Sequence, residues 1–282
     1  MRKLLKQVGW LIAIIIGVAI LTLIFTYIIQ KGMEIFADRN GVALSESAIY
    51  GVSGTLGSGL AAIAIWVIIR YAKRLKFYHC PNPVAPKWTA IFILFTFVVC
   101  RIVLPGIWAY TSYALGVQAT PVGYAPDEST WQMIFLVVIF APVFEELLFR
   151  KDIFSLLKMR FSLSWTVGFS ALLFAVIHGY SVRGFVSCLV AGGLFAILMA
   201  RTGKLLPCII AHVLCNLESL YYNTTESDNF LIVNLNGHTT YNAYILVIGL
   251  LIMIIGCVYL CKFGKRMSNE RLHEESHPKV RY

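Results

Sequence analysis

Long runs of apolar residues alternate with short polar segments along this 282-residue chain. Each run holds about 17–22 residues, and an α-helix of about 20 residues crosses the hydrocarbon core of a bilayer. The runs predict eight helices, at residues 9–29, 49–69, 89–110, 131–149, 163–182, 184–200, 205–222 and 243–261. We therefore expect an all-α fold, a polytopic membrane bundle of eight transmembrane helices.

Composition indicates the same class of protein. Hydrophobic residues make up 59% of the chain and charged residues only 13%, whereas a soluble protein carries roughly 25% charged residues. A bundle of this size is expected to be one domain with a shared interior. The sequence therefore predicts one membrane-embedded helical domain over residues 1–262, followed by a basic cytosolic tail at 263–282.

The distribution of Lys and Arg predicts the orientation of the bundle. Twenty of these 24 residues lie before the first run, after an even-numbered run or in the tail, and only Lys31, Arg39 and Arg183 lie in the segments expected on the other side. Because basic residues accumulate on the cytoplasmic side, we expect a multi-pass protein of the cell membrane with both termini in the cytosol. The net charge of +10 then reflects topology, and without a basic stripe it does not indicate nucleic-acid binding.

Polar side chains interrupt the apolar runs in the second half of the chain. A charged side chain at the centre of a bilayer costs about 2.5–3.5 kcal/mol on the insertion scale, so such residues face a partner or a cavity. Spacings of i, i+4 place side chains on shared helix faces. The pairs are Glu146 with Arg150, Phe174 with His178, and His212 with Asn216. Glu145 is rotated about 100° from Glu146, so the two carboxylates are expected to serve different purposes.

The helical rise predicts that Glu145, His178 and His212 lie at a similar depth. Glu145 and His178 are 33 residues apart, which fits two helical arms of about 14 residues and a turn near residues 160–164. The fourth helix must then continue past its apolar run to about Met159. His178 lies about 8 Å from the outer turn and His212 about 12 Å from the inner turn, which brings the two imidazoles within one helical turn of a common level.

Three motifs resemble those of a known family of membrane peptidases. EELLFR (145–150), FAVIH (174–178) and HVLCN (212–216) match the EExxxR, FxxxH and HxxxN/D motifs of the CAAX-protease and bacteriocin-processing (Abi) family, which includes type II CAAX prenyl endopeptidases. The motifs occur in the family's order, and none of their positions departs from the pattern. The resemblance implies an eight-helix core that includes about residues 130–222.

By this resemblance the protein is an intramembrane endopeptidase. Glu145 would be the general base that activates water, and His178 would share or orient that water. His212 and Asn216 would stabilise the oxyanion that forms during peptide hydrolysis.

Glu146 and Arg150 would form a structural ion pair at the site. The implied partners are the lipid bilayer and a peptide or protein substrate, with or without a lipid modification. The family suggests peptide maturation or bacteriocin self-immunity as the biological setting.

A zinc form of this site stays open. Glu145, His178 and His212 are the candidate ligands for Zn²⁺, with water as the fourth ligand. Glu145 would then need another residue to act as the base. No CxxC pair occurs among the seven cysteines, so a zinc ribbon is not predicted.

Two functions of other classes also stay open. A non-enzymatic bacteriocin immunity protein would bind a peptide toxin and use the same residues as binding groups. A proton-coupled transporter also places Glu and His inside the membrane. The sequence has no repeated halves with paired broken helices, which weighs against a transporter.

Overall fold

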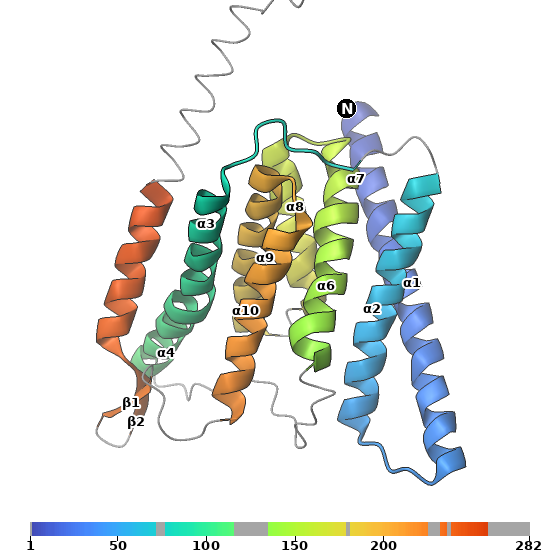
Figure 1. Ribbon diagram of the computed structural model, residues 1–282, viewed down its shortest axis with the longest axis horizontal. Helices are drawn as coiled ribbons and strands as arrows, with labels where there is room; N and C mark the ends of the chain where they lie inside the picture. The colour runs from blue at the N-terminus through green and yellow to red at the C-terminus, as the bar shows by residue number, and fades with distance from the viewer. Residues whose placement is uncertain are drawn as a thin grey trace, which may run out of the picture.

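The computed structural model describes residues 2–71, 77–115, 135–178, 181–224, 232–235 and 238–258. Helices in this part of the chain run side by side as one bundle, with a short two-stranded hairpin at one end (Figure 1). The expected tail at 263–282 and the start of the expected fourth helix, at 131–134, lie outside the described residues.

The elements follow one another in a simple order. They are α1 (Arg2–Asn40), α2 (Glu46–Tyr71), α3 (Pro86–Val98), η1 (Val99–Val103), α4 (Leu104–Ala114), η2 (Leu136–Phe140), α6 (Ala141–Glu146), η3 (Leu147–Ile153), α7 (Phe154–Lys158), α8 (Leu163–His178), α9 (Val182–Thr202), α10 (Leu205–Thr224), β1 (Ile232–Leu235) and β2 (His238–Tyr241), where η marks π-helical turns. A further helix, Ala243–Val258, follows the strands.

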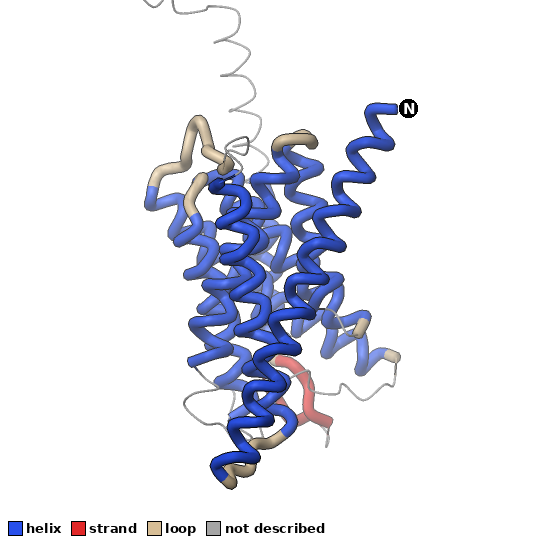
Figure 2. Tube along the Cα trace, turned by 90° about the vertical axis from the view of Figure 1, so that its right-hand side faces the viewer, coloured by secondary structure: helices blue, strands red, loops and turns tan. Residues whose placement is uncertain are grey.

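Figure 1 shows α1 and α2 as a helical hairpin on one side of the bundle, and the helix of residues 243–258 beside α3 and α4 on the other side. The elements from α6 to α10 lie between them. The strands lie toward the end opposite the amino terminus, as the turned view in Figure 2 also shows. The centre of the bundle is therefore built from the segment that carries the three motifs.

The helical membrane architecture agrees with the expectation from the apolar runs. By length and composition, four helices in the described part of the chain are able to cross a membrane: Ile16–Asn40, Ile49–Ile68, Pro86–Ser112 and Val182–Thr202. Three apolar helices there are shorter: Leu163–His178, Leu205–Leu217 and Ala243–Val258. The total of eight spans and the cytosolic position of both termini stay predictions.

The β-hairpin departs from the expected all-α fold. β1 and β2 are antiparallel, with Ile232 opposite Tyr241 and Leu235 opposite His238. The sequence between the strands is Asn236-Gly237, the residue pair that most strongly favours a two-residue hairpin turn. Its neighbours include several β-branched residues, which also favour strands. The sequence therefore contained a hairpin signal that the search for apolar runs missed.

α1 is longer than the first apolar run predicted. It contains 39 residues, against the expected range 9–29. Lys31 was expected in a loop, but it forms an ion pair with Glu34 on the same helix. The Gln30 amide also donates a hydrogen bond to Glu34 at 3.0 Å. Because these polar side chains satisfy one another along one face, the helix continues beyond the apolar run.

π-helical turns precede two prolines within otherwise continuous helices. Pro105 follows η1, and Pro142 follows η2. Proline lacks an N–H donor and its ring clashes with the carbonyl one turn earlier in an α-helix. A π turn pairs residues five apart and is one way to accommodate such a local disturbance. The helix continues past Pro105 through α4.

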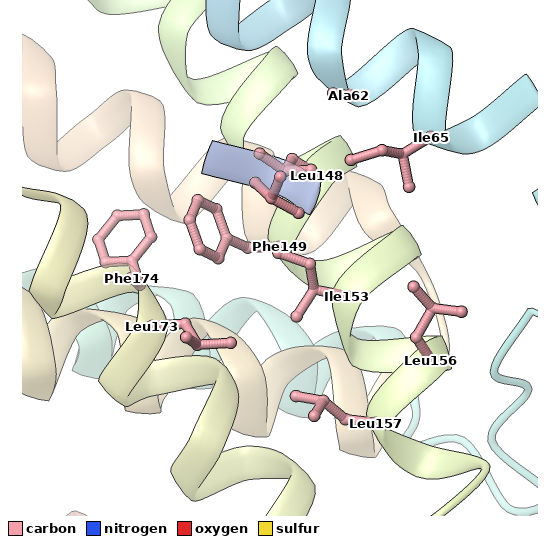
Figure 3. Close-up of a cluster of buried hydrophobic side chains, with 10 residues drawn as sticks. Ala62, Ile65, Leu148, Phe149, Ile153, Leu156, Leu157, Leu173 and Phe174 are labelled. Atoms are coloured by element: carbon pink, nitrogen blue, oxygen red, sulfur yellow. The ribbon is translucent and has the colours of Figure 1, made fainter. Parts of the chain in front are cut away.

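The segment from η2 to α7 continues past Arg150 to Lys158, as the depth argument required. It alternates π and α turns, whereas the sequence predicted α-helix throughout. Its residues Phe149, Ile153 and Leu157 are buried with Phe174 of α8 in one apolar cluster (Figure 3). This cluster fixes η3 and α7 against α8 and so holds the end of α6 in place.

Candidate active site

Glu145 lies near the end of α6 and faces two imidazoles. Its Oε2 atom is 3.3 Å from Nε2 of His178, at the end of α8, and 3.7 Å from Nε2 of His212, on α10. The Glu145 side chain is 17% exposed and that of His212 is 7% exposed. The structure therefore brings together, from three helices, the three residues that the depth argument placed near one level.

Glu146 connects His212 to Arg150. Its Oε1 atom accepts a hydrogen bond from Nδ1 of His212 at 2.9 Å, and its Oε2 atom lies 3.1 Å from Nε of Arg150. Glu146 and Arg150 are both fully buried. Removing either partner of such a pair leaves an uncompensated buried charge, so the two residues depend on each other. The ion pair is formed as its spacing predicted, and it also touches the imidazole, which the sequence did not indicate.

Arg150 holds three parts of the bundle together. Its Nη2 atom donates a hydrogen bond to the carbonyl of Gly192 on α9 at 3.1 Å. Its guanidinium carbon lies 4.6 Å from the ring centre of Phe174 on α8 and 5.3 Å from that of Phe195 on α9. Guanidinium groups are attracted to aromatic faces at such distances. The arginine therefore fixes η3 against both α8 and α9.

Two phenylalanines stack on the imidazoles. The ring of Phe174 lies 4.3 Å from that of His178, and the ring of Phe195 lies 4.9 Å from that of His212, with both pairs nearly parallel. Phe174 was expected from its i, i+4 spacing to His178. Phe195 was missed, because it belongs to a helix without a recognised motif. The sequence feature that could have pointed to Phe195 is its position three residues after Gly192, which places both residues on the same face of α9.

Gly192 allows α8 and α9 to approach each other closely. A Cβ atom at this position would lie 3.1 Å from Cδ1 of Phe174 and 3.3 Å from Cα of Ala171. At Gly193 the nearest such contact is an ordinary 3.9 Å. Only the first of the two glycines is therefore required by packing, as small residues often are between membrane helices.

Asn216 binds a backbone carbonyl that the π turn leaves without a helical donor. Its Nδ2 atom donates to the carbonyl of Val137 at 3.0 Å. The N–H of Ala141 is taken by Leu136, five residues earlier, and the next residue, Pro142, has no N–H. The carbonyl of Val137 therefore takes its donor from α10. The amide of Asn216 has a second N–H that this contact does not use.

The hydrogen-bond partners determine which ring nitrogens carry hydrogen. Nδ1 of His178 lies 2.8 Å from the carbonyl of Phe174, which can only accept, and Nδ1 of His212 faces the carboxylate of Glu146. Both Nδ1 atoms are thus assigned as donors. In the neutral rings, both Nε2 atoms then present lone pairs toward Glu145. The Glu145 carboxylate and both Nε2 atoms are then all acceptors, so a hydrogen must lie between the carboxylate and the imidazoles.

Glu145, His178 and His212 are the candidate ligands for zinc at this site. Carboxylate and imidazole are suitable ligand types. In the described residues, however, no group of three His, Cys, Asp or Glu side chains is arranged to hold a metal ion. The sequence HEESH at 273–277 matches the zinc motif HExxH, but it lies in the tail, outside the described residues.

The fold and the site together define a class of protein: a membrane-embedded helical bundle that buries a carboxylate, two imidazoles and an ion pair at its centre. Residues 127–217, about a third of the chain, match the family model described as Type II CAAX prenyl endopeptidase Rce1-like. The match confirms the resemblance carried by the three motifs, so this segment is similar to type II CAAX prenyl endopeptidases. No curated protein and no solved structure matches the chain.

Proposed function

We propose that this protein is an intramembrane endopeptidase in which Glu145 activates water for the hydrolysis of a peptide bond. The observation that supports this most directly is the approach of the Glu145 carboxylate to Nε2 of His178 and Nε2 of His212, at 3.3 and 3.7 Å. A water molecule held by Glu145 and His178 has acceptors for both of its protons and keeps a lone pair for attack on a carbonyl carbon.

Glu145 is the general base in this proposal. It takes one proton from the water as the oxygen attacks the peptide carbonyl, and it later gives a proton to the leaving amine. His178 orients the water through Nε2, because its Nδ1 is fixed on the carbonyl of Phe174. The largely buried site limits bulk water, which strengthens the electrostatic interactions of the reacting groups.

His212 and Asn216 stabilise the oxyanion. Since Nδ1 of His212 is bonded to Glu146, its Nε2 can donate only when the ring is protonated on both nitrogens. The carboxylate of Glu146 holds the ring in this orientation and lies beside the positive charge that the ring carries when it donates, as the acid behind the histidine does in other hydrolases. The second N–H of Asn216 supplies a further donor. Glu146 is therefore a positioning residue that acts through His212.

The proposed substrate is a peptide or protein that enters from the bilayer or its surface. The family model bears the name of prenyl endopeptidases, so peptides with a lipid-modified C-terminal segment are the first substrates to test. Peptide maturation and self-immunity against a bacteriocin are the two settings in which such cleavage would serve a cell.

The test is cleavage in proteoliposomes. Wild-type protein and the variants Glu145→Gln, His178→Ala and His212→Ala are incubated with unmodified and farnesylated peptides, and products are identified by mass spectrometry. We expect the wild type to cleave and each variant to lose activity by about 10²-fold or more. Glu34→Gln removes a carboxylate from α1, far along the chain from the motifs, and serves as the matched control.

Four results would contradict the proposal. Full activity in all three variants would remove the assigned roles. Binding of a peptide without cleavage by the wild type would favour an immunity protein, and pH-driven uptake in the same vesicles would favour a transporter. Loss of cleavage with a chelator, restored by zinc, would replace the glutamate–water mechanism by the zinc form.

A further inference from the structure

An apolar cleft lies between α3, α9 and the helix of residues 243–258. Its cavity volume is about 70 Å³, so the cleft is a narrow slot. None of its lining residues belongs to the cluster around Glu145. The cleft is therefore a separate feature of the bundle.

The floor and the mouth of the cleft differ in character. Phe95 packs against Gly256 at the floor, where a Cβ atom on the glycine would lie 2.3 Å from Cε2 of the ring. Ile91 and Leu198 contribute apolar walls. Trp88, at the mouth, is seven residues before Phe95, so the cleft follows α3 for about 10 Å. Such a narrow apolar slot suits a hydrocarbon chain.

The mouth is basic. Arg201 contributes to the lining, and the Lys87 ammonium lies 5.5 Å from the ring centre of Trp88. Residues 77–115, 181–217 and 243–258 contain no Asp or Glu, so the segments that border the cleft carry no acidic side chain. Positive charge beside a tryptophan is typical of a membrane interface that attracts anionic headgroups.

We propose that this cleft binds an anionic phospholipid, with one acyl chain against Phe95 and Leu198 and the phosphate at Arg201 and Lys87. The apolar walls exclude a soluble anion, which has no chain to bury. They also disfavour a peptide segment, whose backbone polar groups would lose water without gaining partners. The basic mouth favours an anionic lipid over a zwitterionic one because the latter has no net charge.

The test measures lipid retention by native mass spectrometry. The full chain is reconstituted in nanodiscs of phosphatidylcholine with or without phosphatidylglycerol, and the lipid that stays bound after release is counted. We expect wild-type protein to retain phosphatidylglycerol selectively. Arg201→Ala should weaken its binding about fivefold, the effect of losing one basic residue near an anionic surface. Thr89→Phe, which places a ring in the cleft, should abolish it.

Lys158→Ala is the matched control, because it removes a positive charge at the end of α7, outside the cleft lining. Its lipid retention should equal that of the wild type, and thermal unfolding should show that all variants are folded. Equal retention of both lipids, or equal weakening by Lys158→Ala, would overturn the proposal. So would displacement of phosphatidylglycerol by a farnesylated peptide, which would assign the cleft to a substrate chain. Cleavage is not measured, so this test and that of the peptidase function fail independently.

Discussion

At the scale of single residues, the adjacent glutamates at the centre of the bundle have different environments. Glu145 is partly exposed and faces two Nε2 atoms, whereas Glu146 is fully buried between His212 and Arg150. A rotation of about 100° per residue separates the two side chains. One carboxylate is therefore available to a reacting molecule, and the other controls the histidine beside it.

Glu146→Gln tests this division of labour. The amide oxygen can still accept from Nδ1 of His212, but the negative charge behind the ring is lost. We expect kcat to fall by about 10²–10³-fold, as when an oxyanion donor is lost, with little change in KM. Peptide cleavage measured over a range of substrate concentrations gives both values.

In Glu146→Gln the buried guanidinium of Arg150 loses its charged partner, which should lower the stability of the protein by about 3–5 kcal/mol. The control therefore also removes the charge of Arg150. The double variant with Arg150→Met should recover the thermal unfolding midpoint while staying slow in catalysis. Recovery of wild-type kcat in the double variant would mean that Glu146 has only a structural role.

At the scale of elements, the π turns determine which polar groups meet. In a continuous α-helix the N–H of Ala141 would bind the carbonyl of Val137, and Asn216 would not be needed there. The π turn of η2 gives that N–H to Leu136 instead. His212 and Asn216 share one face of α10. His212 therefore contacts the candidate site, while Asn216 contacts the backbone of η2.

A double-mutant cycle measures the backbone contact. Asn216→Ala leaves the carbonyl of Val137 without this donor and should destabilise the protein by about 1–3 kcal/mol. Pro142→Ala restores an N–H five residues after Val137, so the same Asn216 substitution should cost less in that background. Unfolding in detergent, followed by circular dichroism, gives the coupling energy.

The cycle also separates stability from catalysis. If the second N–H of Asn216 stabilises the oxyanion, the double variant should be stable but still impaired in cleavage. Strictly additive stability losses would show that Val137 and Asn216 are not coupled through Pro142.

At the scale of the whole molecule, the loops at the two ends of the bundle differ in charge. Exposed Val42 lies in the loop between α1 and α2, and exposed Asn82 lies in the segment before α3. Figure 1 shows the turn from α1 to α2 and the start of α3 at opposite ends of the bundle. The excess of Lys and Arg predicts that the second of these loops lies in the cytosol.

Thiol labelling of intact cells checks this orientation. In a background without reactive native cysteines, Val42→Cys should react with a membrane-impermeant reagent, and Asn82→Cys should react only after the cells are permeabilised. The paired positions control for expression and reagent quality. Labelling of Asn82→Cys alone in intact cells would reverse the predicted topology.

The sequence by itself determined the helical membrane class and the residues of the candidate site. Apolar runs need no tertiary information, because backbone groups in lipid must be satisfied within each helix. The depth of Glu145, His178 and His212 followed from the helical rise alone. The β-hairpin was also present in the sequence, as Asn236-Gly237, although the search for apolar runs missed it.

Only the tertiary structure decided which atoms face one another. The contact between Glu146 and His212, the stacking of Phe195 and the bond from Asn216 to Val137 join helices that are distant in the chain. Spacing along one helix defines a face, but helix rotation and local π turns determine what that face meets. These depend on how whole helices pack, and no single segment of sequence contains that information.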